Sequence, residues 1–494
     1  MSWLFGVLAF VRQFLVPIIA AAIFGSRGDG TPSWFAFLIV PLLVAAIWKQ
    51  YFYRYGLGPS GLVIREGVFF HNVRQIDYGR IENIDTERGV LHRMLGVAEV
   101  RVETSTGGKP EALIQVLGLK AAEALRQQVF ASRGEQREIV QEREEVLLRM
   151  PVLEVVKFGL IDNRGMIVVA GLFGLLYESG AVEIWTAIVR NWVSAQVLND
   201  LIALGPLIQV TLATGLLVAM LALVRVFSVV LALLTLYDFT LARLGADLRA
   251  RYGLLTRIAL TLRMRRIQAA HVTDTLLHRW FRRVSVRVDL AGDGSTAEQG
   301  EEANNKVRWL APLAEPPRAR ELIAIALPDV DFQAAVDWQP LAAGAKRRVF
   351  RRSLAWWTLI AVVIAVVLRS FAPLALIAVG LPISMWYASM YVRYTRWALQ
   401  PDALFFRYGC LTRKMIVVPR IRVQTVCLTE SPFDRSHAMA SVCVDTAGAG
   451  PRSDQLRIPY LERHVARELG LALYESSALE SERELQAFSK VAPA

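Results

Sequence analysis

Residues 67–103 read GVFFHNVRQIDYGRIENIDTERGVLHRMLGVAEVRVE, residues 253–289 read GLLTRIALTLRMRRIQAAHVTDTLLHRWFRRVSVRVD, and residues 409–445 read GCLTRKMIVVPRIRVQTVCLTESPFDRSHAMASVCVD. These three stretches align without a gap. In every copy an arginine lies 13 residues after the first glycine, and an acidic residue closes the block 36 residues after it. Chance does not keep such spacings three times, so the chain contains an internal duplication.

Two arginines recur in each copy. They are Arg80, Arg266 and Arg422 at the first position, and Arg93, Arg279 and Arg435 at the second. A guanidinium group matches phosphate in a bidentate way, so phosphate binding is one interpretation. Recurrence in every copy favours a structural role, because a fold needs the residue each time. We expect the first set to pair with the closing acidic residues, Glu103, Asp289 and Asp445.

Each copy has the pattern of a small β domain. Runs such as residues 100–103 and 442–445 alternate apolar and polar residues, which is typical of strands. Glycine-rich turns follow, and then come helical stretches at 120–130, 318–326 and 462–474, with apolar residues every three or four positions. The pattern predicts short antiparallel strands that form a curled sheet or barrel, closed by one C-terminal helix.

The repeated block resembles the bacterial pleckstrin-homology (PH)-like domains of YdbS/YdbT-type membrane proteins. The resemblance is carried by Arg80-Ile81-Glu82, a polar turn, a Leu-x-Arg segment, the linking Gly96 and a Val-x-Val strand. It implies a split β-barrel with a C-terminal helix in each copy, and suggested roles in envelope stress or antimicrobial-peptide resistance. Arg282 and Ala438 replace the linking glycine. In the third copy Ser436-His437 also replaces the usual apolar pair, so its turn is expected to differ in shape.

Apolar segments alternate with these polar blocks. The chain is 54% hydrophobic and 20% charged, and a spanning helix needs about 20 mostly apolar residues. Segments of this kind lie at 3–24, 34–48, 165–177, 207–237, 354–368 and 373–391. We therefore predict an α+β membrane protein with about six transmembrane helices in three pairs and three PH-like split β-barrels. Full spanning is left open for 3–24, which contains Arg12, and for the short 165–177.

The predicted domain order follows from these segments. Transmembrane pairs are expected at 1–53, 150–236 and 346–392, and PH-like domains at 54–135, 237–335 and 393–480. Segments 49–157, 237–352 and 393–494 hold 50 of the 56 Lys and Arg residues. Because cytoplasmic loops carry the excess of basic residues, all three domains are predicted to face the cytoplasm from a bacterial inner membrane.

The sequence contains no recognisable catalytic or metal-binding pattern. The six histidines form no HExxH motif, and the aligned His92 and His278 are expected at the surface or in a turn. Cys410, Cys427 and Cys443 have no CxxC spacing and are predicted to be reduced thiols. Neither an enzyme nor a cofactor is expected.

Basic residues near the apolar segments are the predicted binding residues. The net charge of +12 fits anionic lipid better than nucleic acid, because the basic runs lie beside helix ends and no nucleic-acid recognition motif occurs. The predicted contacts are Arg265, Arg266, Arg282, Arg283, Lys346, Arg347, Arg348, Arg351 and Arg352. Part of this positive charge also sets the orientation of the helices in the membrane. Arg225 lies inside the fourth apolar segment. It is either an intramembrane charge that is functional or paired, or a residue whose side chain snorkels to the membrane interface.

The sequence favours a non-enzymatic membrane scaffold whose PH-like domains bind a protein, a peptide or anionic lipid. The alternative is a transport or lipid-handling path with the barrels as regulators, which Arg12 and Arg225 motivate. The expected partners are the bilayer and a membrane protein, such as a smaller companion with a single PH-like domain. Nucleic acid is not expected.

Overall fold

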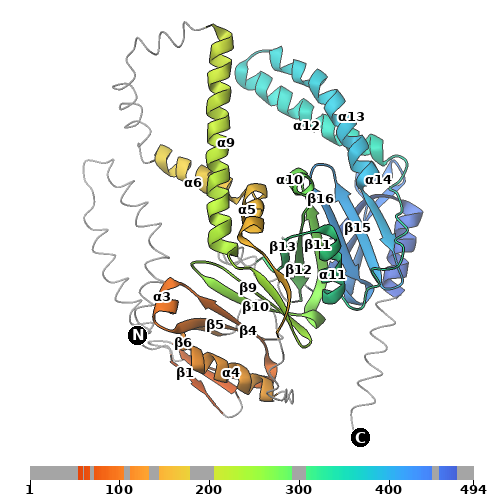
Figure 1. The fold of residues 1–494 in the computed structure, drawn as a ribbon. Coiled ribbons are helices and arrows are strands. Elements are labelled where there is room, and N and C mark those ends of the chain that lie inside the picture. Colours follow the sequence, from red (N-terminus) through yellow and green to blue (C-terminus); the bar gives the residue numbers. More distant parts are fainter. Residues whose placement is uncertain are drawn as a thin grey trace.

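The computed structural model describes residues 54–58, 61–66, 72–104, 112–132, 144–178, 205–291, 307–447 and 456–475. These residues form a mixed α+β protein with four antiparallel sheets and several long helices (Figure 1). The predicted apolar segments 3–24 and 34–48 lie outside the described residues.

The three repeats build three similar domains of six strands and a helix. The first contains β1 (Arg54–Leu57), β2 (Gly61–Glu66), β3 (Asn72–Asp77), β4 (Ile81–Arg88), β5 (Val97–Thr104), β6 (Ala112–Gly118) and α4 (Leu119–Ser132). The second contains β8 (Thr240–Leu244), β9 (Asp247–Tyr252), β10 (Arg257–Arg263), β11 (Ile267–Asp274), β12 (Val284–Leu290), β13 (Trp309–Ala314) and α11 (Pro316–Ala326). The third contains β14 (Arg396–Leu399), β15 (Ala403–Gly409), β16 (Arg413–Pro419), β17 (Val423–Thr429), β18 (Met439–Thr446), β19 (Leu456–Glu462) and a helix over residues 463–475. In each domain a 3-10 turn at the first recurring arginine separates the first three strands from the last three.

Successive domains are joined by pairing between their edge strands. β4 of the first domain pairs with β10 of the second, in a seven-stranded sheet that also includes β7 (Glu145–Arg149) from the preceding linker. β11 of the second domain pairs with β16 of the third, in a six-stranded sheet. We call these pairings the first and second strand junctions. The two halves of the middle domain therefore belong to different sheets, and the three domains form one continuous array.

A short helix and a left-handed residue follow the fourth strand of every domain. The helices are α3 (Val90–Met94), α10 (Leu276–Phe281) and α14 (Pro432–Arg435). The next turn has positive φ at Gly96 (67°), Arg282 (54°) and Ala438 (52°). A non-glycine residue pays about 1–2 kcal/mol for this conformation, so the surrounding fold must impose it. The third copy thus has a shorter helix than the second, but the residue at the corresponding turn position keeps the left-handed conformation.

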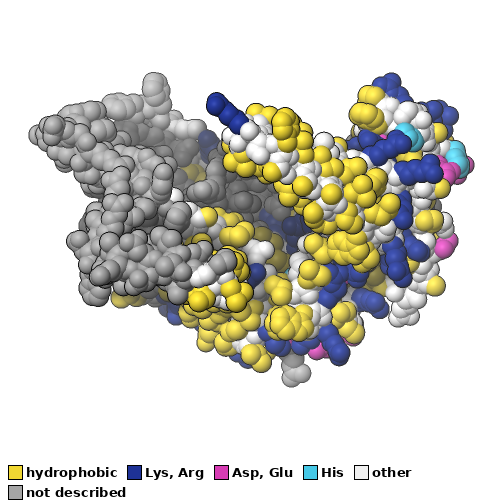
Figure 2. Space-filling model, turned by 90° about the horizontal axis from the view of Figure 1, so that it is seen from above, with side chains coloured by type: hydrophobic (Ala, Val, Ile, Leu, Met, Phe, Trp, Pro, Cys, Tyr) yellow, Lys and Arg dark blue, Asp and Glu magenta, His cyan; other side chains and the backbone are white. Residues whose placement is uncertain are grey.

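Three helices of the described part are long and apolar enough to cross a membrane. They are α9 (Pro206–Leu236), α12 (Ala345–Leu368) and the segment Ala372–Tyr394, which contains α13 (Leu376–Tyr394). Their large apolar side chains are exposed, for example Leu216 at 74% and Val367 at 73%, as contact with lipid tails requires (Figure 2). The helix in the predicted segment 165–177, α6 (Arg164–Glu178), has only 15 residues. About six spanning helices are therefore not confirmed, and the described residues contain three.

Two glycines bring α5 (Val152–Ile161) and α6 close to α9. A Cβ added to Gly165 would lie 2.2 Å from Ser228 Oγ and 2.7 Å from the carbonyl oxygen of Val224. A Cβ added to Gly159 would lie 2.6 Å from Val229 Cα. The Gly165 amide also donates to Ser228 Oγ at 3.1 Å. Because backbone atoms cannot yield as a flexible side chain can, glycine is required at both positions.

Gly165→Ala is expected to destabilise the protein by at least about 1–3 kcal/mol, since the added methyl group overpacks the helix contact. The matched control is Gly171→Ala on the same helix, where nothing lies within 4 Å of the added atom. This control should be neutral or stabilising by up to about 1 kcal/mol, because alanine is the better helix former. Thermal unfolding midpoints in detergent test the pair, and equal shifts for the two variants would contradict the proposed contact.

His278 is buried, with 4% of its surface exposed, so the expected surface or turn position is wrong for this residue. It is the third residue of α10 and forms a capping box with Thr275, whose amide donates to His278 Nδ1 at 3.3 Å. His278 Nε2 lies 2.8 Å from Ser285 Oγ. Burial lowers the pKa of His278 from 6.5 to about 4. The neutral imidazole is thus part of the folded structure.

The protein should lose stability as the pH falls from about 6.5 to about 4. As the pH falls, His278 of the unfolded chain takes up a proton before the buried His278 of the folded protein does. The stabilisation that the neutral His278 provides is therefore complete above the pKa of the unfolded state and is lost as the pH falls toward the pKa of the folded state. The loss amounts to at most about 3 kcal/mol. His278→Gln keeps a capping acceptor and should flatten this part of the profile. The exposed His464→Gln should leave the profile unchanged, as measured by denaturant unfolding at several pH values.

Candidate anion-binding site

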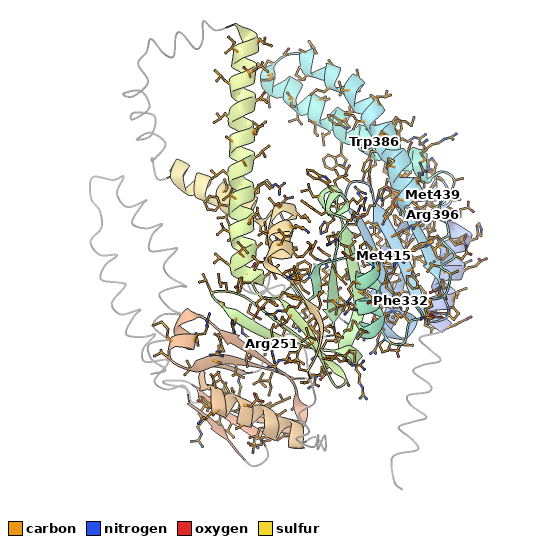
Figure 3. All side chains as sticks on the ribbon, viewed as in Figure 1. Arg251, Phe332, Trp386, Arg396, Met415 and Met439 are labelled. Atoms are coloured by element: carbon orange, nitrogen blue, oxygen red, sulfur yellow. The ribbon has the colours of Figure 1, made fainter. Side chains whose placement is uncertain are left out.

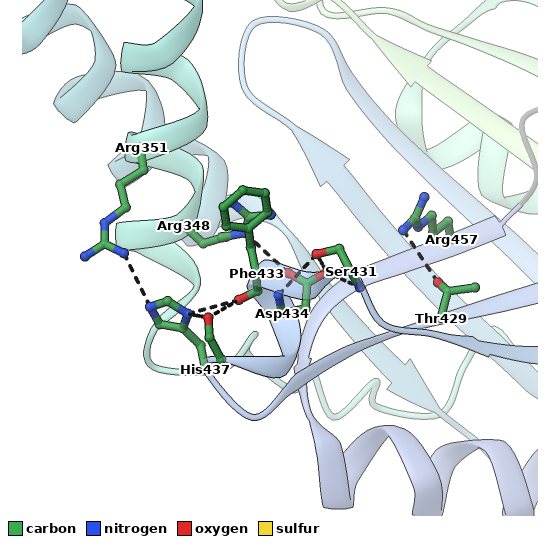
Figure 4. Close-up of polar contacts among 9 residues, drawn as sticks. Arg348, Arg351, Thr429, Ser431, Phe433, Asp434, His437 and Arg457 are labelled. Carbon is green, nitrogen blue, oxygen red and sulfur yellow. Dashed lines mark hydrogen bonds and ion pairs between the residues drawn. The ribbon is translucent and has the colours of Figure 1, made fainter.

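The basic cluster at the start of α12 divides into anchoring and exposed residues. Arg348 Nε lies 3.3 Å from Asp434 Oδ1, and its guanidinium lies over the Phe433 ring (Figure 4). Arg351 Nη1 contacts His437 Nε2 at 3.4 Å, and Arg352 lies over the ring of Tyr460 at 5.9 Å. These three arginines therefore fix α12 to the third domain.

The partner of Arg348 is a carboxylate built into the short helix α14. Asp434 accepts hydrogen bonds from both the hydroxyl and the amide of Ser431. Burial alone would raise the pKa of Asp434, but the hydrogen bonds from Ser431 and Arg348 hold it below its usual value. Lys346 and Arg347 are exposed and have no side-chain partner within the described part of the chain. Arg351 and Arg352 are exposed as well, so within the described residues only Arg348 of the cluster is half-buried.

The four predicted contacts in the second domain also divide. Arg283 is mostly buried and binds Glu154 of α5 through two nitrogens, at 3.1 and 3.2 Å. Burial would raise the pKa of Glu154, but hydrogen bonds from Arg283 and Lys157 hold it below its ordinary value. Arg266 donates to the carbonyl oxygen of Ala291. Arg265 and Arg282 have exposed side chains.

The second set of recurring arginines connects neighbouring domains. Arg93 donates to the carbonyl oxygen of Leu254 at 3.0 Å, across the first strand junction. Arg279 donates to that of Leu411 at 2.9 Å, across the second junction. The predicted structural role thus has a specific form in these two copies. Arg435 is exposed and makes no side-chain contact with any described residue.

The first set of recurring arginines does not pair as expected in the second and third copies. Asp289 lies 2.7 Å from His271 Nε2 rather than beside Arg266. Arg422 contacts the carbonyl oxygen of Arg265 and lies 3.7 Å from Asp329, rather than pairing with Asp445. In both copies the strand register is irregular directly after the arginine, between Ile267 and Ala269 and between Val423 and Thr425. Arg80 has an exposed side chain.

Arg225 of α9 has polar partners inside the chain. Its Nη1 donates to Asn163 Oδ1 at 2.9 Å and to the carbonyl oxygen of Asp162 at 3.3 Å. Both acceptors lie in the link between α5 and α6. Arg225 is therefore hydrogen-bonded to neutral acceptors within the chain, and a functional role for it stays a prediction.

A pocket of about 540 Å³ opens at the first strand junction, beside the end of α9. Its lining includes Tyr237 and Asp238, which follow α9, and Leu119 and Ala122 from α4. Five arginines and three carboxylates also line it: Arg88, Arg149, Arg249, Arg251, Arg257, Glu123, Glu144 and Asp238. Figure 3 shows Arg251 near the strands that join the first two domains.

Two of these arginines face each other without a counter-charge. Arg88 of β4 lies directly opposite Arg257 of β10, so their side chains project from the same face of the sheet. Arg251 pairs with Glu144 at 2.9 Å and Arg149 with Asp238 at 3.2 Å. Arg88 Nε is buried without a hydrogen-bond partner, and no described residue forms an ion pair with Arg88 or Arg257. Like charges directly opposite each other destabilise a strand pair, which indicates a place for an anion.

The second strand junction provides an internal comparison. The same register places Asp274 opposite Arg413, a pair of opposite charges. Here Arg413 lies over the Tyr394 ring at 4.5 Å, and Arg407 lies over the Trp338 ring at 4.2 Å. Burial lowers the pKa of Arg407. At the second junction these two arginines thus lie on aromatic rings, although their Nε atoms are buried without a hydrogen-bond partner, as Arg88 Nε is. The first junction has an arginine-lined pocket.

Sequence reasoning missed this pocket because its residues lie far apart in the chain and in different repeats. The one feature of the sequence that pointed to the pocket was a charge difference between the repeats. The first copy has Arg88 at a position where the other copies have Asp274 and Glu430. That difference acquires meaning only when the strand register is known. Among the described residues, no group of three or more His, Cys, Asp or Glu side chains is arranged to hold a metal ion.

Comparison with known proteins agrees with the repeat structure. The bacterial PH domain family model matches residues 5–133, 197–325 and 357–476. A relative, the UPF0699 transmembrane protein YdbT of Bacillus subtilis (strain 168), is 20% identical over 422 residues, which are 82% of each chain. No solved structure matches significantly. The three family matches cover most of the chain and coincide with its three repeats, and the protein therefore belongs to the bacterial PH domain family, as a membrane protein with three copies of the domain.

Proposed function

We propose that this protein is a non-enzymatic membrane scaffold that binds the phosphate-bearing headgroup of an anionic lipid at the first strand junction. The observation that carries the proposal is Arg88 directly opposite Arg257, with no ion-pair partner among the described residues. A phosphate accepts two parallel hydrogen bonds from a guanidinium and would turn this repulsion into attraction.

The size and position of the pocket support a headgroup as the ligand. Small-molecule sites measure about 300–1,000 Å³, and this pocket falls within that range. Tyr237 and Asp238, which follow the apolar helix α9, are part of its lining. A site at the end of a spanning helix lies at the depth of lipid phosphates, where each basic residue contributes about 1 kcal/mol of attraction to an anionic membrane.

A cytoplasmic position of the domains in a bacterial inner membrane is part of the proposal. The basic residues concentrate in the segments that carry the domains, in agreement with the positive-inside rule. The hairpin of α12 and α13 begins and ends beside the third domain, so one side of the membrane holds both of its ends (Figure 1). Lys346 and Arg347, exposed at the start of α12, would face the same anionic surface.

A scaffold explains Arg225 better than a transport path does. Its hydrogen bonds to Asp162 and Asn163 account for the intramembrane charge without a transported substrate. A part in envelope stress or antimicrobial-peptide resistance fits a scaffold that senses lipid charge, and it remains a component of the proposal.

Arg257→Ala and Arg88→Ala should each stabilise the lipid-free protein by about 0.2–1 kcal/mol, because the like-charge contact is removed. Each should also weaken the response to phosphatidylglycerol roughly five- to tenfold, which corresponds to the loss of about 1 kcal/mol per basic residue. Thermal unfolding of the full chain in neutral detergent is the measurement, with phosphatidylcholine and inorganic phosphate as separate additions.

Arg413→Ala is the matched control, because Arg413 occupies the corresponding position of the second junction. It should destabilise the protein through the lost contact with the Tyr394 ring and leave the lipid response unchanged. Stabilisation by inorganic phosphate alone would indicate a soluble phosphate ligand instead of lipid. Equal lipid responses of the wild type and both pocket variants would overturn the proposed site.

A further inference from the structure

Within the described residues, the array of domains ends in two strand edges without a neighbouring strand, and these edges correspond to the two sides of its internal junctions. β3 is the edge of the sheet β1-β2-β3, and β17 is the edge of the sheet β17-β18-β19. By repeat position β17 corresponds to β4 and β11, and β3 corresponds to β10 and β16. Every other strand of these two classes is paired with a strand of the neighbouring domain.

The two internal junctions share one register. In both, the residue 21 positions after the first glycine of a repeat lies opposite the residue four positions after the glycine of the next repeat. These pairs are Arg88 with Arg257 and Asp274 with Arg413. A pairing that recurs in the same register between different sequences is a property of the domain type.

Burial shows what the end strands lack. Asp85 and His271, each 18 positions after the glycine, are 4% exposed at the internal junctions, whereas the corresponding Cys427 of β17 is exposed. Ala259 and Met415, six positions after the glycine, are partly buried, whereas the corresponding Val73 of β3 is 56% exposed. The difference is the one that a missing neighbour strand would cause.

Each end strand exposes an apolar side chain, although β3 (NVRQID) also carries Arg74 and Asp77. β17 reads VQTVCLT and contains no charge, proline or glycine, the devices that usually protect an edge strand. Leu428 of β17 is 50% exposed and Val73 of β3 is 56% exposed. The common register would place these two apolar side chains directly opposite each other, as Val272 and Met415 are at the second junction.

We infer that β17 of one molecule pairs antiparallel with β3 of a second copy of this chain, in the register of the internal junctions. The contact is head-to-tail, so it builds an open row or a closed ring rather than a two-fold dimer. The spanning helices extend to one side of the sheets (Figure 1), which is compatible with such a row in the membrane plane. Arg435 is exposed where Arg93 and Arg279 bridge the internal junctions, and it would bridge to the next copy in the same way.

The natural Cys427 provides a direct test, because the register places it opposite Arg74 of the next copy. Arg74→Cys is introduced together with Cys443→Ser, since Cys443 lies opposite Cys427 on β18 of the same molecule. Membranes that contain the full-length protein are treated with diamide, which oxidises two thiols to one disulfide. We expect a ladder of dimers and higher oligomers on non-reducing gels, and Cys427→Ser should abolish it.

The matched control is Gln75→Cys, also exposed on β3, whose side chain points to the other face of the strand. It should cross-link at least fivefold less. Val73→Glu and Leu428→Lys should each lower the mass of the detergent-solubilised particle, and the two changes together should restore it through opposite charges. Cross-linking equal to that of Gln75→Cys, persistence after Cys427→Ser, or cross-links only to a different polypeptide would each overturn the inference. None of these readouts depends on lipid binding.

Discussion

Antiparallel hydrogen bonding between edge strands of successive domains is the constraint on which this structure depends. It joins β4 to β10 and β11 to β16, so the middle domain contributes one half to each of two sheets. Backbone pairing of this kind tolerates different side chains, because the ladder uses only main-chain groups. The three repeats can therefore diverge in sequence while their relative placement stays fixed.

Because main-chain pairing accepts different side chains, one junction can be filled by side chains while the other contains a pocket. At the second junction Arg407 lies over the rings of Trp338 and Tyr394, and Arg413 lies over Tyr394 and opposite Asp274 in the strand register. At the first junction Arg88 replaces the carboxylate, and the corresponding space is a pocket. Duplication thus supplied two equivalent positions, one of which is free to hold a ligand while the other maintains the array.

Polar contacts tie the helices to the rest of the chain. Arg348, Arg351 and Arg352 attach α12 to the third domain, and Arg225 holds α9 to the link between α5 and α6. The pocket at the first junction is lined by Tyr237 and Asp238, which directly follow α9, so a ligand bound there would lie against the end of this helix. The basic residues near the apolar helices thus divide into those that contact the third domain and those that remain exposed without a partner in the described part of the chain.

The sequence by itself determined the three repeats, the strands with their closing helices, and the apolar segments, because spacing and periodicity are local properties of the chain. It also indicated that Arg93 and Arg279 serve the fold. Only the tertiary structure decided that these arginines cross between domains, that Arg283 is buried against Glu154, and that Arg88 faces Arg257. These contacts depend on which edge strands pair and in which register, and main-chain hydrogen bonding between distant segments leaves no pattern in the sequence of either one.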